Sequence, residues 1–177
     1  TGLCRLTDGR LIRLILKAGD TRKDGNPHYP RLIPEWLAHV AMNAGAINCE
    51  TIIVGHDGEY PFPALDTETA TERLDWLLAG WLAGLERPLP LPQRTVFRYL
   101  AEAHKKPLSA ESIAPFYEGN PNQTGEVDYA GSGALRRCFP DAASLLEPRH
   151  GEETLFAYWA ARLHQPLIDH LGQEGEG

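Results

Sequence analysis

An Asp-Gly pair at residues 8–9 separates two apolar runs at the start of the chain. Asp-Gly between such runs is typical of a tight β-hairpin, because the turn needs a positive φ that glycine adopts without strain. Residues 32–44 then carry apolar side chains at helical spacing, and residues 49–54 are a run rich in β-branched side chains, typical of a buried strand. Because strand patterns lie on both sides of a helix, we predict a mixed α/β fold with a small central sheet flanked by helices.

The remainder of the chain is predicted to be mainly helical, apart from a short strand at residues 59–62. Asp66 is placed to cap the first and longest of these helices. The helices are predicted at residues 67–86, 93–104, 110–116, 134–139 and 152–171. Pro166 should kink the last one, because proline has no N–H to donate. The polar residues 118–133 are expected to form a loop excursion from the core.

The predicted helix at 67–86 has apolar or small residues on two sides. Its main stripe consists of Leu74, Leu77, Leu78, Trp81, Leu82 and Leu85. Trp76 lies on the opposite side, with Ala79 and Ala83. A helix that is weakly polar on both sides is covered on both sides, by its own chain or by a partner. We therefore predict a partner interface at Trp76, Ala79 and Ala83, with burial under a second layer of the same chain as the equal alternative.

Composition places the chain among compact globular domains. It has 177 residues, of which 42% are hydrophobic and 23% charged, and we expect a single domain over residues 1–177. No apolar stretch is long enough for a transmembrane helix. The start at Thr1, without an initiator Met or a signal peptide, suggests the C-terminal fragment of a longer subunit. Three widely spaced cysteines favour a reduced, cytoplasmic compartment.

Charge is distributed unevenly along the chain. The formal net charge is −7, but residues 1–31 sum to +4 and the other residues to −11. The overall acidity argues against a free-standing general nucleic-acid binder, whereas a locally basic segment predicts a distinct surface. We predict that the nucleic-acid-binding residues are Arg10, Arg13, Lys17, Arg22 and Lys23. The alternative is that these cations are solvated strand edges and loops.

The sequence contains none of the common catalytic or phosphate-binding motifs. GxxxxGK, GxSxG, HExxH and GxGxxG are all missing. His39 is expected to face solvent on its helix, and His164 and His170 are six residues apart, which is the wrong interval for paired metal ligands on one helix face. We expect no catalytic residue, no metal ligand and no cofactor.

A metal-dependent nuclease site of the restriction-endonuclease-like kind can be excluded on the lysines alone. Such a site needs one acidic residue, followed by a second acidic residue and a lysine that lie two positions apart on a strand. The two carboxylates hold the metal, and the lysine polarises the attacking water. The chain has four lysines, and the residues two before them are Ile15, Thr21, Ala103 and His104. None of these is acidic. Arginine stands in the corresponding place after Asp8 and Asp20, and it remains protonated and suits anion contacts instead.

Three segments in order resemble a known family. They are the helix Ile33–Val40, the hairpin segment Ile52–Leu65 with its Asp-Gly-Glu turn and proline-flanked exit, and Phe116–Asn120. Together they resemble the C-terminal region of the RecC family, the gamma subunit of exodeoxyribonuclease V. The resemblance runs from about Arg31 to Leu171, and the basic hairpin before it matches less clearly.

The resemblance implies a restriction-endonuclease-like core that has lost its catalytic residues. It also implies a non-catalytic scaffold of the RecBCD helicase–nuclease, which acts in double-strand-break repair and recombination. The expected partners are RecB-like and RecD-like subunits, and DNA at the fork. No catalytic residue can be transferred from the family. Two alternatives stay open: an active metal-dependent nuclease with an unrecognised site, and a protein-interaction module without a DNA role.

Overall fold

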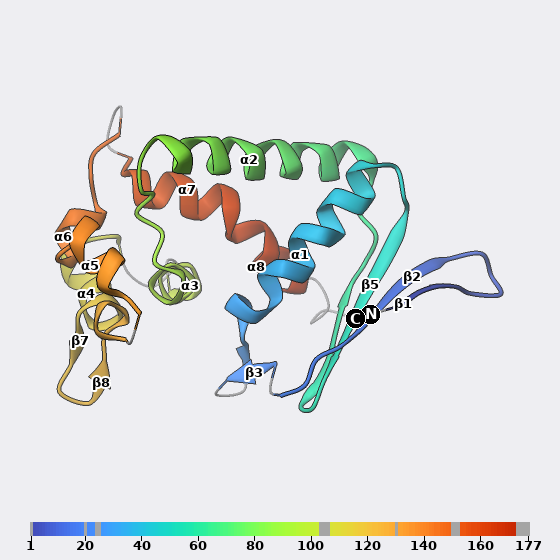
Figure 1. The fold of residues 1–177 in the computed structure, drawn as a ribbon, viewed down its shortest axis with the longest axis horizontal. Coiled ribbons are helices and arrows are strands. Elements are labelled where there is room, and N and C mark those ends of the chain that lie inside the picture. The colour runs from blue at the N-terminus through green and yellow to red at the C-terminus, as the bar shows by residue number, and fades with distance from the viewer. Residues whose placement is uncertain are drawn as a thin grey trace. The chain divides into compact units, whose positions relative to one another are not determined.

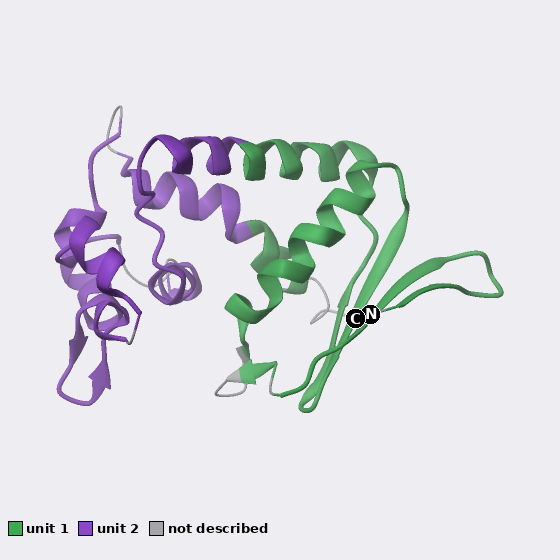
Figure 2. Ribbon diagram, viewed as in Figure 1, with its two compact units in different colours: residues 1–78, 166–177 green, residues 79–165 purple. Residues whose placement is uncertain are grey.

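The computed structural model describes residues 2–19, 21–23, 26–102, 107–129, 131–149 and 153–172. The fold is mixed α/β, with a small mixed sheet and flanking helices, as predicted (Figure 1). The chain divides into two compact units, which are described separately below (Figure 2). Unit 1 comprises residues 1–78 and 166–177, and unit 2 comprises residues 79–165. The expectation of a single domain stays a prediction.

Unit 1 contains a four-stranded sheet. Its strands are β1 (Gly2–Arg5), β2 (Leu11–Leu16), β5 (Cys49–Gly55) and β6 (Gly58–Phe62), in the order β1-β2-β5-β6. The predicted Asp-Gly hairpin is confirmed: β1 pairs antiparallel with β2, and Gly9 has a φ of +91° in the turn. β2 and β5 are parallel, and β5 and β6 are antiparallel. A separate pair, β3 (Arg22–Lys23) and β4 (Asn26–Pro27), lies between β2 and the first helix.

Helix α1 (Tyr29–Ala44) makes the crossover that parallel β2 and β5 require. It begins three residues before the predicted start. Pro34 lies beyond the first turn of this helix, and it is exposed. The buried side of α1 packs toward the sheet and consists of Leu32, Trp36, His39, Val40 and Asn43. The prediction that His39 faces solvent is wrong, because this side chain is fully buried.

Asn43 joins the end of α1 to the start of β5. Its side-chain amide donates to the carbonyls of His39, at 2.9 Å, and Cys49, at 3.1 Å. Its Oδ1 accepts a hydrogen bond from the Cys49 amide at 3.1 Å. The buried backbone groups at this corner are thus satisfied by one side chain. Gly45 caps the C-terminus of the helix, and the residue in the left-handed region is Ala46, with a φ of 59°.

Helix α2 (Thr67–Glu86) has the predicted bounds and is capped as predicted. The Thr69 amide and hydroxyl donate to the two carboxylate oxygens of Asp66, at 2.8 and 2.7 Å. Residues 67–78 of α2 belong to unit 1 and the rest to unit 2 (Figure 2). The predicted last helix is two helices, α7 (Leu155–Leu163) and α8 (Gln165–Gly172). The break precedes Pro166, which cannot continue the amide ladder.

Unit 2 is built from short helices around an apolar core. Its helices, besides the end of α2 and α7, are α3 (Gln93–Glu102), α4 (Ala110–Tyr117), α5 (Gly133–Cys138) and α6 (Ala142–Leu145). The core consists of Val96, Ile113, Tyr117, Val127, Ala142, Leu145, Phe156 and Ala160. None of the described helices in either unit combines the length and apolar character needed to cross a membrane.

The polar segment predicted as a loop, residues 118–133, has local structure. It contains the two-residue strands β7 (Gly119–Asn120) and β8 (Gln123–Thr124), a 3₁₀ turn at Glu126–Asp128 and the first residue of α5. Glu126 accepts hydrogen bonds from the first amides of α3, and Glu118 accepts one from the first amide of α6. Carboxylates at helix N-termini are stabilising there. These two acidic residues therefore serve the packing of unit 2.

Candidate functional site

The basic residues predicted to bind nucleic acid lie on and around β2 in unit 1. Arg10 immediately precedes β2, Arg13 is within it, and Lys17 immediately follows it. Arg22 and Lys23 form the short strand β3. The side chain of Lys23 lies outside the described residues. The side chains of the other four predicted cations are among the described residues.

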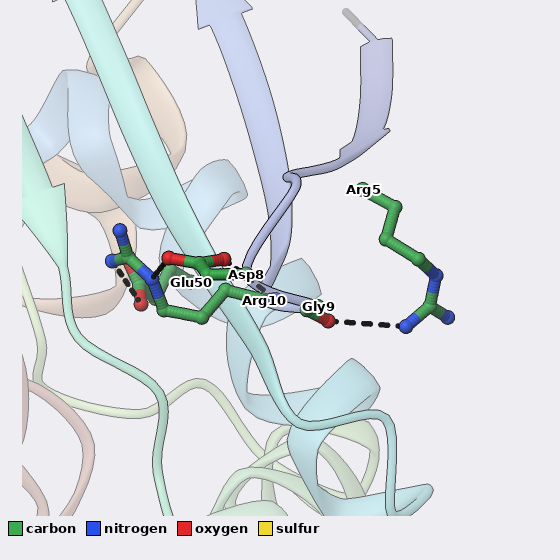
Figure 3. A network of polar contacts seen from close by, with 5 residues as sticks. All are labelled: Arg5, Asp8, Gly9, Arg10 and Glu50. Carbon is green, nitrogen blue, oxygen red and sulfur yellow. Dashed lines mark hydrogen bonds and ion pairs between the residues drawn. The ribbon is translucent and has the colours of Figure 1, made fainter.

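Arg10 is held by two carboxylates (Figure 3). Its Nε lies 2.8 Å from Asp8 Oδ2, and its Nη1 lies 3.0 Å from Glu50 Oε1. The hydrogen bond from Arg10 lowers the pKa of Asp8, and the two carboxylates together raise the pKa of Arg10. The three groups carry a formal charge of −1. This end of the hairpin is consequently not a positive surface, although the Arg10 side chain is 56% exposed.

Arg13 and Lys17 share one carboxylate on α1. Arg13 Nη2 lies 2.7 Å from Glu35 Oε2, and Lys17 Nζ lies 3.2 Å from Glu35 Oε1. Lys17 also donates to the carbonyl of Arg31 at 2.7 Å. The side chains of Arg13 and Glu35 are each only 15% exposed. Because these groups are partly shielded from water, the cluster ties the crossover helix to β2, and its net formal charge is +1.

Arg22 belongs to a turn that is organised by Asp57. The Asp57 carboxylate accepts hydrogen bonds from the Thr21 hydroxyl, at 2.6 Å, and from the amides of Thr21 and Arg22. The Thr21 hydroxyl, followed by these amides, lowers the pKa of Asp57 well below its usual range. The Arg22 guanidinium lies over the ring of Tyr60, 5.5 Å from its centroid. Asp57 thus stabilises the loop that presents Arg22.

Among the described cations, Arg13 and Lys17 are brought together by Glu35, and Arg10 is paired separately. One positive patch formed by all five residues stays a prediction. Arg10, Arg13 and Lys17 are each paired with a carboxylate from another element, either Glu50 or Glu35. The Arg22 guanidinium lies over the Tyr60 ring, and its backbone amide donates to Asp57. The sequence signal that could have predicted this pairing is the excess of acidic residues in the remainder of the chain. Binding of DNA phosphates here requires the phosphates to compete with these carboxylates.

A buried cluster of two histidines lies between α1 and α8 in unit 1. The rings of His39 and His170 are 5.5 Å apart between centroids, and both contact the rings of Trp36 and Phe62. His39 Nδ1 lies 3.1 Å from Thr51 Oγ1, while the Nε2 atoms of both histidines have no hydrogen-bond partner among the described residues. Burial, and then the neighbouring His170, lowers the pKa of His39 to about 4. Burial also lowers the pKa of His170.

The histidine pair was missed at the level of sequence because the two residues are on different helices. Two imidazoles alone do not make a metal site. Among the residues described by the structure, no three His, Cys, Asp or Glu side chains come together to hold a metal ion. The pair is kept neutral in an aromatic environment, where a charged imidazolium would be poorly solvated.

The residues predicted to contact a partner lie on the less exposed side of α2. Trp76, Ala79 and Ala83 are all half-buried. Gly80, between them, is buried, and a Cβ atom at this position would lie 2.7 Å from Leu163 Cδ1 on α7. The main apolar stripe of the helix is exposed over its second half, at Leu78, Trp81, Leu82 and Leu85. Partner contact at Trp76, Ala79 and Ala83 stays a prediction.

Comparison with known proteins places the chain in a family. No curated protein matches the sequence. The family model of the RecC C-terminal domain matches residues 2–104. The match includes the basic hairpin, where the resemblance was less clear, and ends before the Phe116–Asn120 segment. Because the matched residues are more than half of the protein, the chain belongs to the RecC C-terminal domain family.

Proposed function

We propose that this chain is a non-catalytic scaffold and DNA-handling domain of a RecBCD-type exodeoxyribonuclease V complex. The observation that carries the proposal is membership of the RecC C-terminal domain family, because RecC is the gamma subunit of that complex. Its role in the complex is double-strand-break repair and recombination, and its partners are RecB-like and RecD-like subunits.

We also propose that unit 1 is a degenerate restriction-endonuclease-like core. A metal-dependent nuclease needs carboxylates that are free to bind a divalent ion. In unit 1, Asp8 and Glu50 bind Arg10, Glu35 binds Arg13 and Lys17, and Asp57 binds backbone amides. The four-stranded mixed sheet with a helical crossover is compatible with such a core. The acid-x-lysine pair that the chemistry requires is missing from the sequence.

A nuclease assay separates this proposal from the alternative of an active enzyme. The chain is incubated with linear DNA and Mg²⁺ or Mn²⁺ and compared with the double variant Asp8→Asn, Glu50→Gln. We expect no cleavage by either protein. Cleavage by the unchanged chain that disappears in the double variant would show an active site at this end of the sheet.

Assembly tests the scaffold role itself. The chain is co-expressed with the RecB-like and RecD-like subunits of the same organism, and retention is measured by affinity purification. We expect the chain to be retained, whereas failure of the unchanged chain to join either subunit contradicts the proposal. An interaction module without a DNA role remains the second reading, and the acidic net charge of −7 is the observation that favours it.

Direct DNA contact is proposed at Arg10, Arg13, Lys17, Arg22 and Lys23. The support is their position on one short stretch of the chain and the exposure of Arg10 and Arg22. Charge reversal of these two exposed arginines should weaken binding of fork DNA by the assembled complex. The salt dependence should become shallower by about one unit of slope per phosphate contact removed. Arg98→Glu, at an exposed cation of α3, is the matched control. Unchanged affinity at every salt concentration would remove these residues from the DNA path.

A further inference from the structure

One face of α2 exposes large apolar side chains along the C-terminal half of the helix. Trp81 is 62% exposed, and Leu82 and Leu85 are 57% and 66% exposed. Leu78, one turn earlier, is 49% exposed. The four positions follow the spacing i, i+3, i+4 and i+7, so they share one side of a single helix. We call them the α2 face.

The chain's own packing is directed away from the α2 face. Gly80 is buried near Leu163 of α7, and Leu77 is half-buried. Large apolar side chains of the kind that usually form a core are thus exposed on this helix, whereas Gly80 is packed. Contiguous exposed apolar surface is typical of an interaction site, and tryptophan is enriched among the residues that dominate interface energies.

The N-terminal half of α2 adds an acidic border to the same row. Glu68, Glu72 and Asp75 are exposed. Successive spacings from Glu68 to Glu72, to Asp75 and on to Leu78 are four, three and three residues, so the row continues along one side of the helix. In the part of the chain that the structure describes, none of these three carboxylates forms an ion pair. The row is therefore negative over two turns and apolar over the next two.

We propose that the α2 face binds an amphipathic helix of a partner protein, whose apolar side packs on Trp81 and Leu82 and whose Lys or Arg residues lie against the acidic turns. A basic amphipathic helix would complement both the acidic turns and the exposed apolar side chains of this row. In attributing the helix to a partner subunit, this inference rests on the proposed function. It concerns a different side of α2 from Trp76, Ala79 and Ala83.

A second copy of the chain is a poorer occupant. If it docked through its own α2 face, it would bring further acidic turns and few cations to balance them. Arg73 is half-buried, and Arg87 is paired with Glu147, with Nη1 3.0 Å from Oε1. Like charges brought together across an interface disfavour the wrong partner. The charge pattern thus favours a basic helix over self-association.

Two synthetic peptides test the chemistry of the occupant. Both are amphipathic helices with the same leucine seam, and one ends in lysines where the other ends in glutamates. Binding to the full chain is measured by fluorescence anisotropy at low and high salt. We expect the lysine peptide to bind about tenfold more tightly at low salt, with a smaller difference at high salt because ions screen exposed charges. Equal affinity for the two peptides at low salt overturns the proposal.

Variants locate the binding on the helix. Leu82→Glu should weaken binding of the lysine peptide by about tenfold or more, as loss of a central apolar contact does. Glu72→Lys should reduce the preference for the lysine peptide. Leu16→Glu, at a leucine of β2 that is 71% exposed, is the matched control and should leave binding unchanged. Circular dichroism checks that each variant is folded. Binding that survives Leu82→Glu, or a dimer detected by light scattering that Leu82→Glu dissolves, overturns the proposal.

The assembled complex distinguishes this inference from the proposed function. If the unchanged chain joins the RecB-like and RecD-like subunits and the Leu82→Glu chain does not, both are supported. If the two chains join equally well, the α2 face is not the docking surface, although the scaffold role stands. If the unchanged chain does not join at all, the scaffold role fails, and the peptide measurements alone decide whether the face binds a basic helix.

Discussion

The basic region around β2 and the long helix α2 depart from their sequence patterns in opposite ways. In the basic region, charges that looked available are used internally, because Arg10, Arg13 and Lys17 are each paired with a carboxylate. On α2, large apolar side chains of the main stripe are exposed, as at Trp81 and Leu82. A formal charge is therefore not an available charge, and an apolar stripe is not necessarily a buried one. Both differences are set by which elements pack together.

The largest expected effect is the response of the unit 1 interior to acid. Unfolded histidine binds a proton near pH 6.5, whereas folded His39 does so only near pH 4. Between these values the unfolded state binds more protons, so stability falls as the pH decreases from 6.5 to 4. A shift of this size corresponds to about 3 kcal/mol at pH 4. Urea denaturation across this pH range measures it.

The matched variant for this measurement is His39→Gln, which cannot titrate. It should be less stable at pH 7 and show a shallower loss of stability between pH 6.5 and 4. The remaining slope comes from His170, whose pKa is also lowered by burial, and from carboxylates of lowered pKa such as Asp57. An unchanged slope in the variant would mean that His39 is accessible to protons in the folded state.

Glu35→Gln tests whether the paired cations of the basic region are structural. The substitution leaves Arg13 and Lys17 beside a neutral amide in a partly shielded position. We expect a loss of about 2 kcal/mol, between the small value of surface ion pairs and the larger cost of breaking a buried one. The midpoint of urea denaturation, at a constant slope, gives the value.

A double variant separates the energy of the Arg13–Glu35 pair from the cost of leaving the cation unpaired. In Arg13→Met combined with Glu35→Gln, the substitutions should be less costly together than the sum of the single changes, because the uncompensated cation is gone. Additivity within about 0.5 kcal/mol would indicate that the pair contributes little coupling and that Arg13 is free to bind a ligand.

Two adjacent leucines of α2 lie on its packed side and on its exposed side. Leu77 is half-buried and Leu78 is 49% exposed, so the same change to alanine samples the two sides of the helix. We expect Leu77→Ala to cost about 1–2 kcal/mol, less than at a fully buried site, and Leu78→Ala to stay within about 0.5 kcal/mol. Thermal denaturation distinguishes them. Equal costs would place Leu78 in a packed environment and remove it from the α2 face.

A small effect that depends on salt is expected at Arg10→Ala. The arginine and its partner Asp8 are both more than half exposed, so the loss of stability should be below about 1 kcal/mol and should vanish in high salt. The comparison of melting temperatures at low and high salt measures it. A cost that persists in high salt would show that Arg10 is needed to hold the hairpin against β5.

Short-range patterns were sufficient for much of the fold. The Asp-Gly turn, the cap at Asp66 and the bounds of α2 follow from a few neighbouring residues, and the structure confirms all three. The burial of His39 could not be read in this way. On its helix alone, a histidine beside Glu35 is compatible with a solvated face, and only β5, β6 and α8 decide that it is enclosed.

The amino-acid sequence alone was sufficient to predict the α/β class, most of the helices and strands, the absence of an acid-x-lysine pair and membership of the RecC family. These depend on local propensity, on periodicity and on ordered motifs, all of which are present in the linear chain. Which carboxylates pair with Arg10, Arg13 and Lys17, and which side of α2 is exposed, depended on the packed fold. Both depend on contacts between residues far apart in sequence, such as Arg10 with Glu50 and Gly80 with Leu163. Such contacts exist only once the elements have packed.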